Sequence, residues 1–176
     1  MDSTLVSVTI DSIRVSLVSP HRIVVLKDDD ERFLPIWIGP FEADAITIAL
    51  QGTQPARPLT HDLLKAMMHE FGGEAQQIIV TELHDDTFFA QIVMDWKGKR
   101  VTLDSRPSDA IALAVRLQVP ILVSEQVMAR AAIRPSQGVD KPEADAEETE
   151  QLDAFRDMLQ DLDLDGLGEG KSPKED

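Results

Sequence analysis

The chain of 176 residues contains no cysteine, so it has neither a disulfide framework nor thiolate chemistry. This composition is typical of a reducing compartment. No stretch approaches the roughly 18 to 20 apolar residues of a membrane-spanning helix, and the first residues, Met1–Thr4, lack the basic and apolar regions of a signal peptide. We therefore expect a soluble, cytoplasmic protein.

Positive charge is also scarce, because the chain carries 17 Lys and Arg against 32 Asp and Glu, a net charge of -15. The excess is uneven: residues 1–134 hold 13 basic and 18 acidic side chains, whereas residues 135–176 hold 4 and 14. Nucleic-acid affinity depends largely on cations that release counterions from the polyanion. A nucleic-acid-binding function therefore requires a local basic patch.

Composition divides the chain near residue 134. A content of 43% hydrophobic residues in a chain of this length predicts one domain with a sizeable core, which we place at 1–134. From Pro135, residues typical of linkers and acidic residues dominate, so we expect 135–176 to be largely disordered. Within it, four apolar residues at helical spacing predict a short amphipathic helix over 152–165: Leu152, Phe155, Leu159 and Leu162. That helix is a candidate binding element for a protein partner.

Alternating apolar and polar residues predict three strands before Gly39. The first covers Val6–Leu17 and is interrupted by a bend or bulge after Ile10. The next two, Arg22–Lys27 and Arg32–Ile38, complete an antiparallel meander. Pro35 lies in the third strand and suits an edge position, because proline cannot donate a ladder hydrogen bond.

Helices and further strands follow. We expect a helix from Pro40 to about Gln51, and then a helix that is capped by Thr60, has one buried apolar stripe and is closed by Gly72 and Gly73. Three strands are expected next, at Gln76–Leu83, Thr87–Trp96 and Lys99–Asp104. A largely buried helix over Asp109–Leu117 and a short strand at Ile121–Val123 complete the domain. This order predicts an α+β fold, in which a mainly antiparallel sheet has about three helices packed on it.

A weak repeat links two of the helices. Asp44–Ala49 and Asp109–Ala114 share the pattern Asp-Ala-Ile-x-x-Ala, and each follows a strand and a proline. One interpretation is a pair of related strand-turn-helix units. The plainer interpretation is that aspartate in a first turn complements the helix dipole and the rest is ordinary helix packing.

Polar residues gather at the boundaries of these elements, where functional residues commonly lie. They are Glu42, Asp44, Arg57, His61, Asp62, Asp104, Arg106, Ser108 and Asp109. The guanidinium groups of Arg57 and Arg106 either bind phosphate bidentately or form ion pairs with neighbouring aspartates that fix their loops. His61 and Asp62 either support a helix start or act in proton transfer or ligand binding. Ser108, like Thr60, is most simply a helix cap.

Two kinds of phosphodiester chemistry are open to these residues. Carboxylates can bind one or two divalent cations such as Mg²⁺ or Mn²⁺, which polarise the phosphate and generate hydroxide. Without a metal, His61 would act as acid or base and the arginines would stabilise charge. The candidate catalytic residues are Glu42, His61, Asp62, Asp104 and Asp109, with Arg57 and Arg106 for substrate binding and Glu42, Asp104 and Asp109 as metal ligands.

Several segments, in the same order, resemble the bifunctional nuclease family. They are Leu34–Gly39, Glu42-Ala43, Arg57–Leu64, Thr87-Phe88 and Asp104–Leu113. The resemblance covers nearly all of residues 5–128. It implies an α+β fold with an antiparallel sheet, degradation of both DNA and RNA, and a bacterial origin. Some members of the family carry a C-terminal UvrB/UvrC-type module where this chain has its acidic segment.

Three functions therefore compete. The first is a nuclease acting on DNA and RNA with a divalent metal. The second is a non-catalytic regulatory domain, in which the boundary residues lock loops together and the 152–165 helix binds a partner. The third is a sensor of small anions that uses Arg57 and Arg106. A homodimer, formed through strand edges within Leu5–Lys27 or through the last short strand, is the expectation from base rates.

Overall fold

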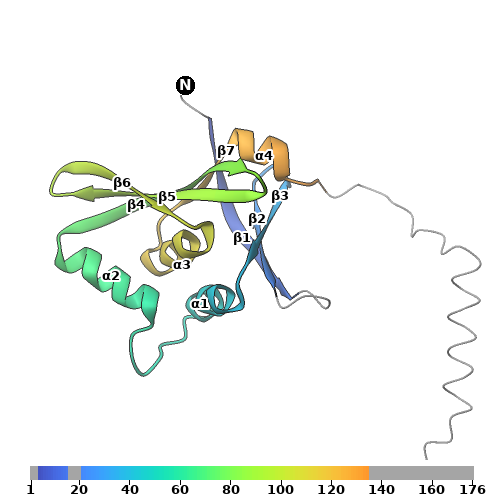
Figure 1. Ribbon diagram of the computed structural model, residues 1–176. Coiled ribbons are helices and arrows are strands. Elements are labelled where there is room, and N and C mark those ends of the chain that lie inside the picture. Colours follow the sequence, from blue (N-terminus) through green and yellow to red (C-terminus); the bar gives the residue numbers. More distant parts are fainter. Residues whose placement is uncertain (1–3, 16–20, 135–176) are drawn as a thin grey trace, which may run out of the picture. The chain divides into compact units, whose positions relative to one another are not determined.

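The computed structural model describes residues 4–15 and 21–134. This part of the chain forms seven strands and four helices (Figure 1). In chain order they are β1 (Leu5–Val15), β2 (Arg22–Lys27), β3 (Phe33–Ile38), α1 (Pro40–Leu50), α2 (Thr60–Glu70), β4 (Gly73–His84), β5 (Thr87–Trp96), β6 (Lys99–Ser105), α3 (Pro107–Leu117), β7 (Ile121–Ser124) and α4 (Glu125–Ala131). The α+β class is confirmed, with four helices in place of about three. The linker and helix expected in 135–176 lie outside the described residues.

The strands form one mixed sheet in the order β3-β2-β1-β7-β4-β5-β6. Every neighbouring pair is antiparallel except β4 and β7, which run parallel. The sheet consists of two meanders, β1-β2-β3 and β4-β5-β6, joined by β7. The first meander is confirmed, as is the bulge in β1, which lies between Ile10 and Ser12.

The ends of the sheet are β3 and β6. Pro35 lies in β3 opposite Val25, so the prediction of an edge position is confirmed. The edges of β1, β2 and β7 were expected to pair across a two-fold axis. Each of these strands instead lies inside the sheet, between two hydrogen-bonded neighbours. Among the described strands, the free outer edges therefore belong to β3 and β6.

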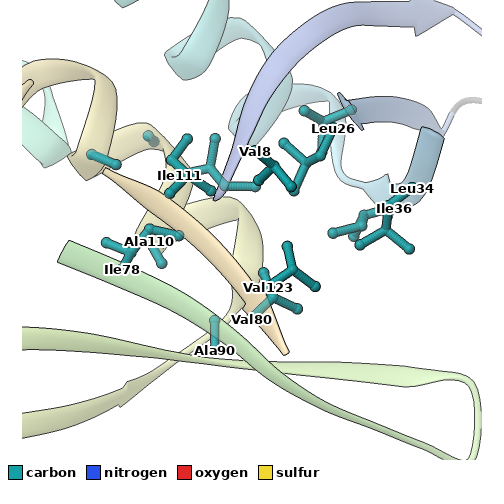
Figure 2. Close-up of a cluster of buried hydrophobic side chains, with 14 of the residues drawn as sticks. Val8, Leu26, Leu34, Ile36, Ile78, Val80, Ala90, Ala110, Ile111 and Val123 are labelled. Atoms are coloured by element: carbon teal, nitrogen blue, oxygen red, sulfur yellow. The ribbon is translucent and has the colours of Figure 1, made fainter. Parts of the chain in front are cut away.

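The core lies between the sheet and a central helix, α3. Its residues Ala110–Ala114 are all buried, which confirms the prediction of a largely buried helix. Figure 2 shows Ala110 and Ile111 among side chains of β1, β4 and β7. Helices α1 and α2 pack against α3 on either side of it. This packing brings the beginnings of three helices close together.

Helix α2 differs from expectation in two ways. Its N-cap is Leu59, not Thr60, and the Asp62 carboxylate accepts a hydrogen bond from the backbone N–H of Leu59 at 2.9 Å. The prediction of a buried apolar stripe on α2 is also wrong, because Leu63 and Met67 are exposed. The only buried residue of α2 is His61, and the helix packs on α3 and β4.

Helix α4 was not expected from the sequence. At seven residues it is too short for a clear apolar periodicity. It is capped by Ser124, whose hydroxyl oxygen accepts a hydrogen bond from the N–H of Val127 at 3.3 Å. Ser108 does not cap α3, because the N-cap is Arg106 and Ser108 is buried in the first turn. Among the described residues, no helix is long and apolar enough to cross a membrane.

Candidate functional site

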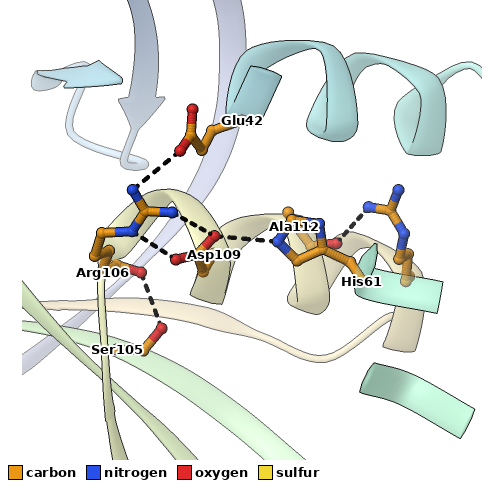
Figure 3. A network of polar contacts seen from close by, with 7 residues as sticks. Glu42, His61, Ser105, Arg106, Asp109 and Ala112 are labelled. Atoms are coloured by element: carbon orange, nitrogen blue, oxygen red, sulfur yellow. Dashed lines mark hydrogen bonds and ion pairs between the residues drawn. The ribbon is translucent and has the colours of Figure 1, made fainter. Parts of the chain in front are cut away.

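The candidate site lies where the first turns of α1, α2 and α3 meet (Figure 3). Both α1 and α3 begin with a proline directly after an edge strand, at Pro40 and Pro107. Proline suits this position, because its missing N–H would have no partner within the helix. The third residue of each helix is acidic, Glu42 in α1 and Asp109 in α3.

Arg106 joins these two carboxylates. Its Nε donates to Asp109 Oδ2 at 2.7 Å and its Nη2 to Asp109 Oδ1 at 3.1 Å, which is a bidentate pair. Its Nη1 lies 3.0 Å from Glu42 Oε1. The Arg106 side chain is nevertheless 65% exposed. The ion-pair interpretation of Arg106 is therefore confirmed, and the guanidinium group still faces solvent.

His61 completes the network from α2. Its Nε2 lies 3.2 Å from Asp109 Oδ1, and its ring is almost fully buried. An ionised carboxylate only accepts hydrogen bonds, so Nε2 carries the proton in this contact. In the neutral ring, Nδ1 is then left as a proton acceptor.

The electrostatics favour the ionised form of Asp109. Burial alone would raise the pKa of Asp109, but the hydrogen bonds from Arg106 and His61 outweigh it and hold that pKa below its ordinary value. The pKa of Arg106 is raised by the hydrogen bonds and charge of Asp109 and, more weakly, by Glu42. The network therefore holds a fixed cation and a fixed anion beside a histidine.

The network borders a hollow of about 600 Å³. Glu42, His61, Arg106 and Asp109 line it together with Asp44 and apolar residues of α1 and the loop before α2. A cavity of this size takes a group as large as a nucleotide unit. Among the described residues, no ion pair links Asp44 to the network.

Three other predicted residues lie apart. Asp62 accepts hydrogen bonds from the Leu59 N–H and, at 2.7 Å, from Arg116 Nε. Asp104 is exposed in β6 opposite Gln91. Arg57 is exposed in the loop before α2. Within residues 4–15 and 21–134, no hydrogen bond or ion pair connects Asp104 or Arg57 to Arg106.

Two residues that shape the site were not predicted from the sequence. The nearly buried Arg116 binds Asp62 and also donates to the carbonyl of Ala112 at 2.8 Å, which fixes α2 against α3. Gly39 lies under the Glu42 carboxylate, and a Cβ at this position would collide with it. A glycine directly before a helix-starting proline was the available signal for the second residue.

The arrangement does not form a preorganised metal centre. Among the described residues, no three His, Asp or Glu side chains are placed to hold one ion. Glu42 and Asp109 share the same arginine, and Asp104 is not part of the network. The expected use of Mg²⁺ or Mn²⁺ stays a prediction.

Known proteins share most of this chain. Residues 24–136, which include the whole network, match the model of the bifunctional nuclease domain. A protein of Mycobacterium tuberculosis that is described only as uncharacterized is 33% identical over 159 residues, covering 90% of this chain and 95% of its own length.

Two plant proteins named as nucleases match as well. Bifunctional nuclease 1 of Arabidopsis thaliana is 34% identical over 112 residues, or 61% of this chain and 34% of the plant protein. Bifunctional nuclease 2 of the same plant is 29% identical over 168 residues, or 82% and 51%. The match to the domain model, which spans more than half of the chain, shows that the chain belongs to the bifunctional nuclease domain family.

Proposed function

We propose that the chain hydrolyses phosphodiester bonds of DNA and RNA in the hollow bordered by Glu42, His61, Arg106 and Asp109. The observation that carries this proposal is the His61–Asp109–Arg106 network, which combines a proton acceptor with an exposed guanidinium group at one cavity. Membership of the bifunctional nuclease domain family supports the substrate class.

Arg106 is suited to holding the phosphate. A guanidinium group has five N–H donors, and three are used in the contacts with Asp109 and Glu42. The remaining donors can bind phosphate oxygens and stabilise the negative charge that develops in the transition state. Because Asp109 and Glu42 fix the guanidinium plane, the group requires little reorganisation on binding.

His61 is suited to activating water. With Nε2 donating to Asp109, Nδ1 can accept a proton from a water molecule whose oxygen forms the new bond to phosphorus. The bond from phosphorus to the leaving oxygen breaks, and the leaving oxygen takes up a proton from solvent. Asp109 stabilises the imidazolium ion that results. A correctly placed general base contributes about 10²- to 10⁴-fold to the rate.

The test is hydrolysis of single- and double-stranded DNA and RNA by the purified full chain, with Mg²⁺, with Mn²⁺ and with EDTA. We expect His61→Asn and Asp109→Asn each to lower kcat/KM by about 100-fold or more. The matched control is His69→Asn, which changes an exposed histidine of the same helix. Unchanged activity in the His61→Asn, Asp109→Asn double variant would show that the activity comes from a contaminant or another site.

The EDTA arm separates the two kinds of chemistry. Activity that persists in EDTA supports the His61 route without metal. Activity that is lost in EDTA and restored by Mn²⁺ supports the predicted metal requirement, and Glu42→Gln and Asp104→Asn then identify the ligands.

A non-catalytic bracing role is the second candidate, because Arg106 forms ion pairs with two carboxylates on two helices. It predicts that the wild-type chain lacks activity on all substrates, while Arg106→Ala lowers Tm by several degrees. Turnover that depends on His61 would exclude it.

A further inference from the structure

Two large aromatic side chains are exposed beside Arg106. Phe41 is 84% exposed and Trp37 is 59% exposed. Single exposed apolar residues are common, but these two adjoin the same arginine. Phe41 lines the 600 Å³ hollow that contains the His61 network, and Trp37 lines a second hollow of about 260 Å³. Arg106 lines both.

Neither aromatic residue is needed by the core. In β3 the inward residues are Ile36 and Ile38, so the alternation of a strand leaves Trp37 outward. In α1 the buried residues are Ala43 and Ile46, and Phe41 in the first turn lies off this buried face. The ring of His21 meets Trp37 edge-on, with centroids 6.3 Å apart. Both rings are therefore held by rigid elements next to the proposed phosphate site.

The charge of the chain favours an apolar contribution to nucleic-acid binding. The net charge of -15 opposes attraction to a polyanion, and Arg106 is itself paired with two carboxylates. Stacking of bases on aromatic rings does not depend on net charge and tolerates any sequence. The bases of a duplex are already stacked on one another, so only unpaired bases can use such rings.

We propose that Phe41 and Trp37 are stacking platforms for unpaired bases on either side of the phosphate at Arg106, and that the chain selects single-stranded nucleic acid. This inference rests on the proposed function for the position of the phosphate. The inference adds a substrate class and two substrate-binding residues to that site.

The test measures binding by the full chain carrying His61→Asn, in EDTA, so that neither proposed kind of chemistry cleaves the probe. The ligands are a labelled single-stranded oligonucleotide, the matching duplex and an abasic strand of the same length, and each further substitution is made in this background. We expect Phe41→Ala to weaken binding of the single strand by about tenfold, with little change for the duplex or the abasic strand. Phe41→Trp should retain the affinity. Phe71→Ala is the matched control, because Phe71 is 68% exposed at the far end of α2.

A second measurement reports on Trp37 directly. The chain has two tryptophans, so in a Trp96→Phe background the emission comes from Trp37 alone. We expect the single strand to quench this emission and the abasic strand to leave it unchanged. The melting temperatures of the Phe41 variants should match that of their parent protein, because the Phe41 side chain is exposed.

The outcomes separate this inference from the proposed function. Equal losses of affinity for the single, double and abasic strands, or no loss at all, would overturn the stacking platforms even if hydrolysis is observed. Selective loss for the single strand in a protein whose wild-type form does not hydrolyse it would support the platforms and overturn the nuclease proposal. A chain that binds no oligonucleotide would overturn the platforms.

Discussion

Helices α1, α2 and α3 each place an acidic residue third in the helix, at Glu42, Asp62 and Asp109. A carboxylate at this position complements the partial positive charge of the helix start. All three were candidates from the sequence because they lie at the boundaries of elements. Each is bound by an arginine, Arg106 or Arg116. The arginine partners were only partly predictable, because Arg116 is 54 residues from Asp62 along the chain.

Asp62 should contribute to stability in a pH-dependent way. The N–H of Leu59 and then Arg116 hold the pKa of Asp62 below its ordinary value of 3.8. Its contribution is therefore fully present above pH 3.8 and is lost as the pH falls through the lower pKa of the folded state. We expect Asp62→Asn to lower the free energy of unfolding by about 1 to 2 kcal/mol at pH 7.

Urea unfolding at pH 7, 5 and 3 measures this effect. The difference between wild type and Asp62→Asn should narrow at pH 3. Asp104→Asn is the control, since Asp104 is exposed and should show a smaller effect. A difference for Asp62→Asn that is the same at all three pH values would contradict the pairing.

At the scale of elements, the two meanders carry the same arrangement. Each ends in an edge strand that is followed by a helix with proline in first position, β3 with α1 and β6 with α3. This supports the interpretation of two related strand-turn-helix units. Aligned on Pro40 and Pro107, however, the residue that corresponds to Asp109 is Glu42, two positions before the Asp44 of the sequence repeat. Periodicity alone could not reveal this offset.

Ser124 and Thr60, at the starts of α4 and α2, give a direct comparison. Ser124 is buried, accepts from Val127 and donates to the carbonyl of Thr81 at 2.9 Å. We expect Ser124→Ala to lower the free energy of unfolding by about 1 to 3 kcal/mol. Thr60→Ala should change it by less than about 0.5 kcal/mol, because Thr60 is not a cap. Chemical unfolding of both variants tests this, and equal losses would contradict the assignment of caps.

Gly39 offers a change at the start of α1 that acts on the site without altering a charge. The Cβ of Gly39→Ala would collide with Oε2 of Glu42, so we expect the carboxylate to shift and its contact with Arg106 through Oε1 to be disturbed. We expect Gly39→Ala to change kcat/KM in the same direction and by a similar factor as Glu42→Gln, with little change in Tm.

Steady-state kinetics of the two single variants and the double variant check this prediction. The double variant should resemble either single variant, because both disturb one interaction. Fully additive effects would show that Gly39 acts independently of Glu42.

At the scale of the whole molecule, charge is divided between residues 1–134, with a net charge of -5, and residues 135–176, with -10. Acidic side chains attached to the domain repel a polyanion over roughly a Debye length, which is about 10 Å at 0.1 M salt. We expect replacement of the acids in 135–176 by Asn and Gln to tighten oligonucleotide binding at low salt. The gain should disappear near 0.5 M salt, where screening is strong. Binding isotherms at both salt concentrations measure it, and a gain that persists at high salt would point to a cause other than charge.

Most strands and helices of the domain could be predicted from the sequence, because alternation, prolines and glycines mark their ends. The order of strands could not, since β7 pairs with β1 and β4 through contacts far apart in the chain, such as Leu5 with Ser124. The candidate site could likewise be predicted only in part. Glu42, His61, Arg106 and Asp109 were candidates from their positions, but only the fold separates them from Asp104 and Arg57.

The place of β7 between the two meanders has a consequence for biosynthesis. A chain made from its N-terminus can form β1-β2-β3 and β4-β5-β6 before residues 121–124 leave the ribosome. Until then, the β7-facing sides of β1 and β4 have no partner, and unpaired strand edges promote aggregation. Among the described strands, the last to be synthesised is thus the one that unites the sheet, so a nascent chain that stalls before it would leave two unjoined half-sheets.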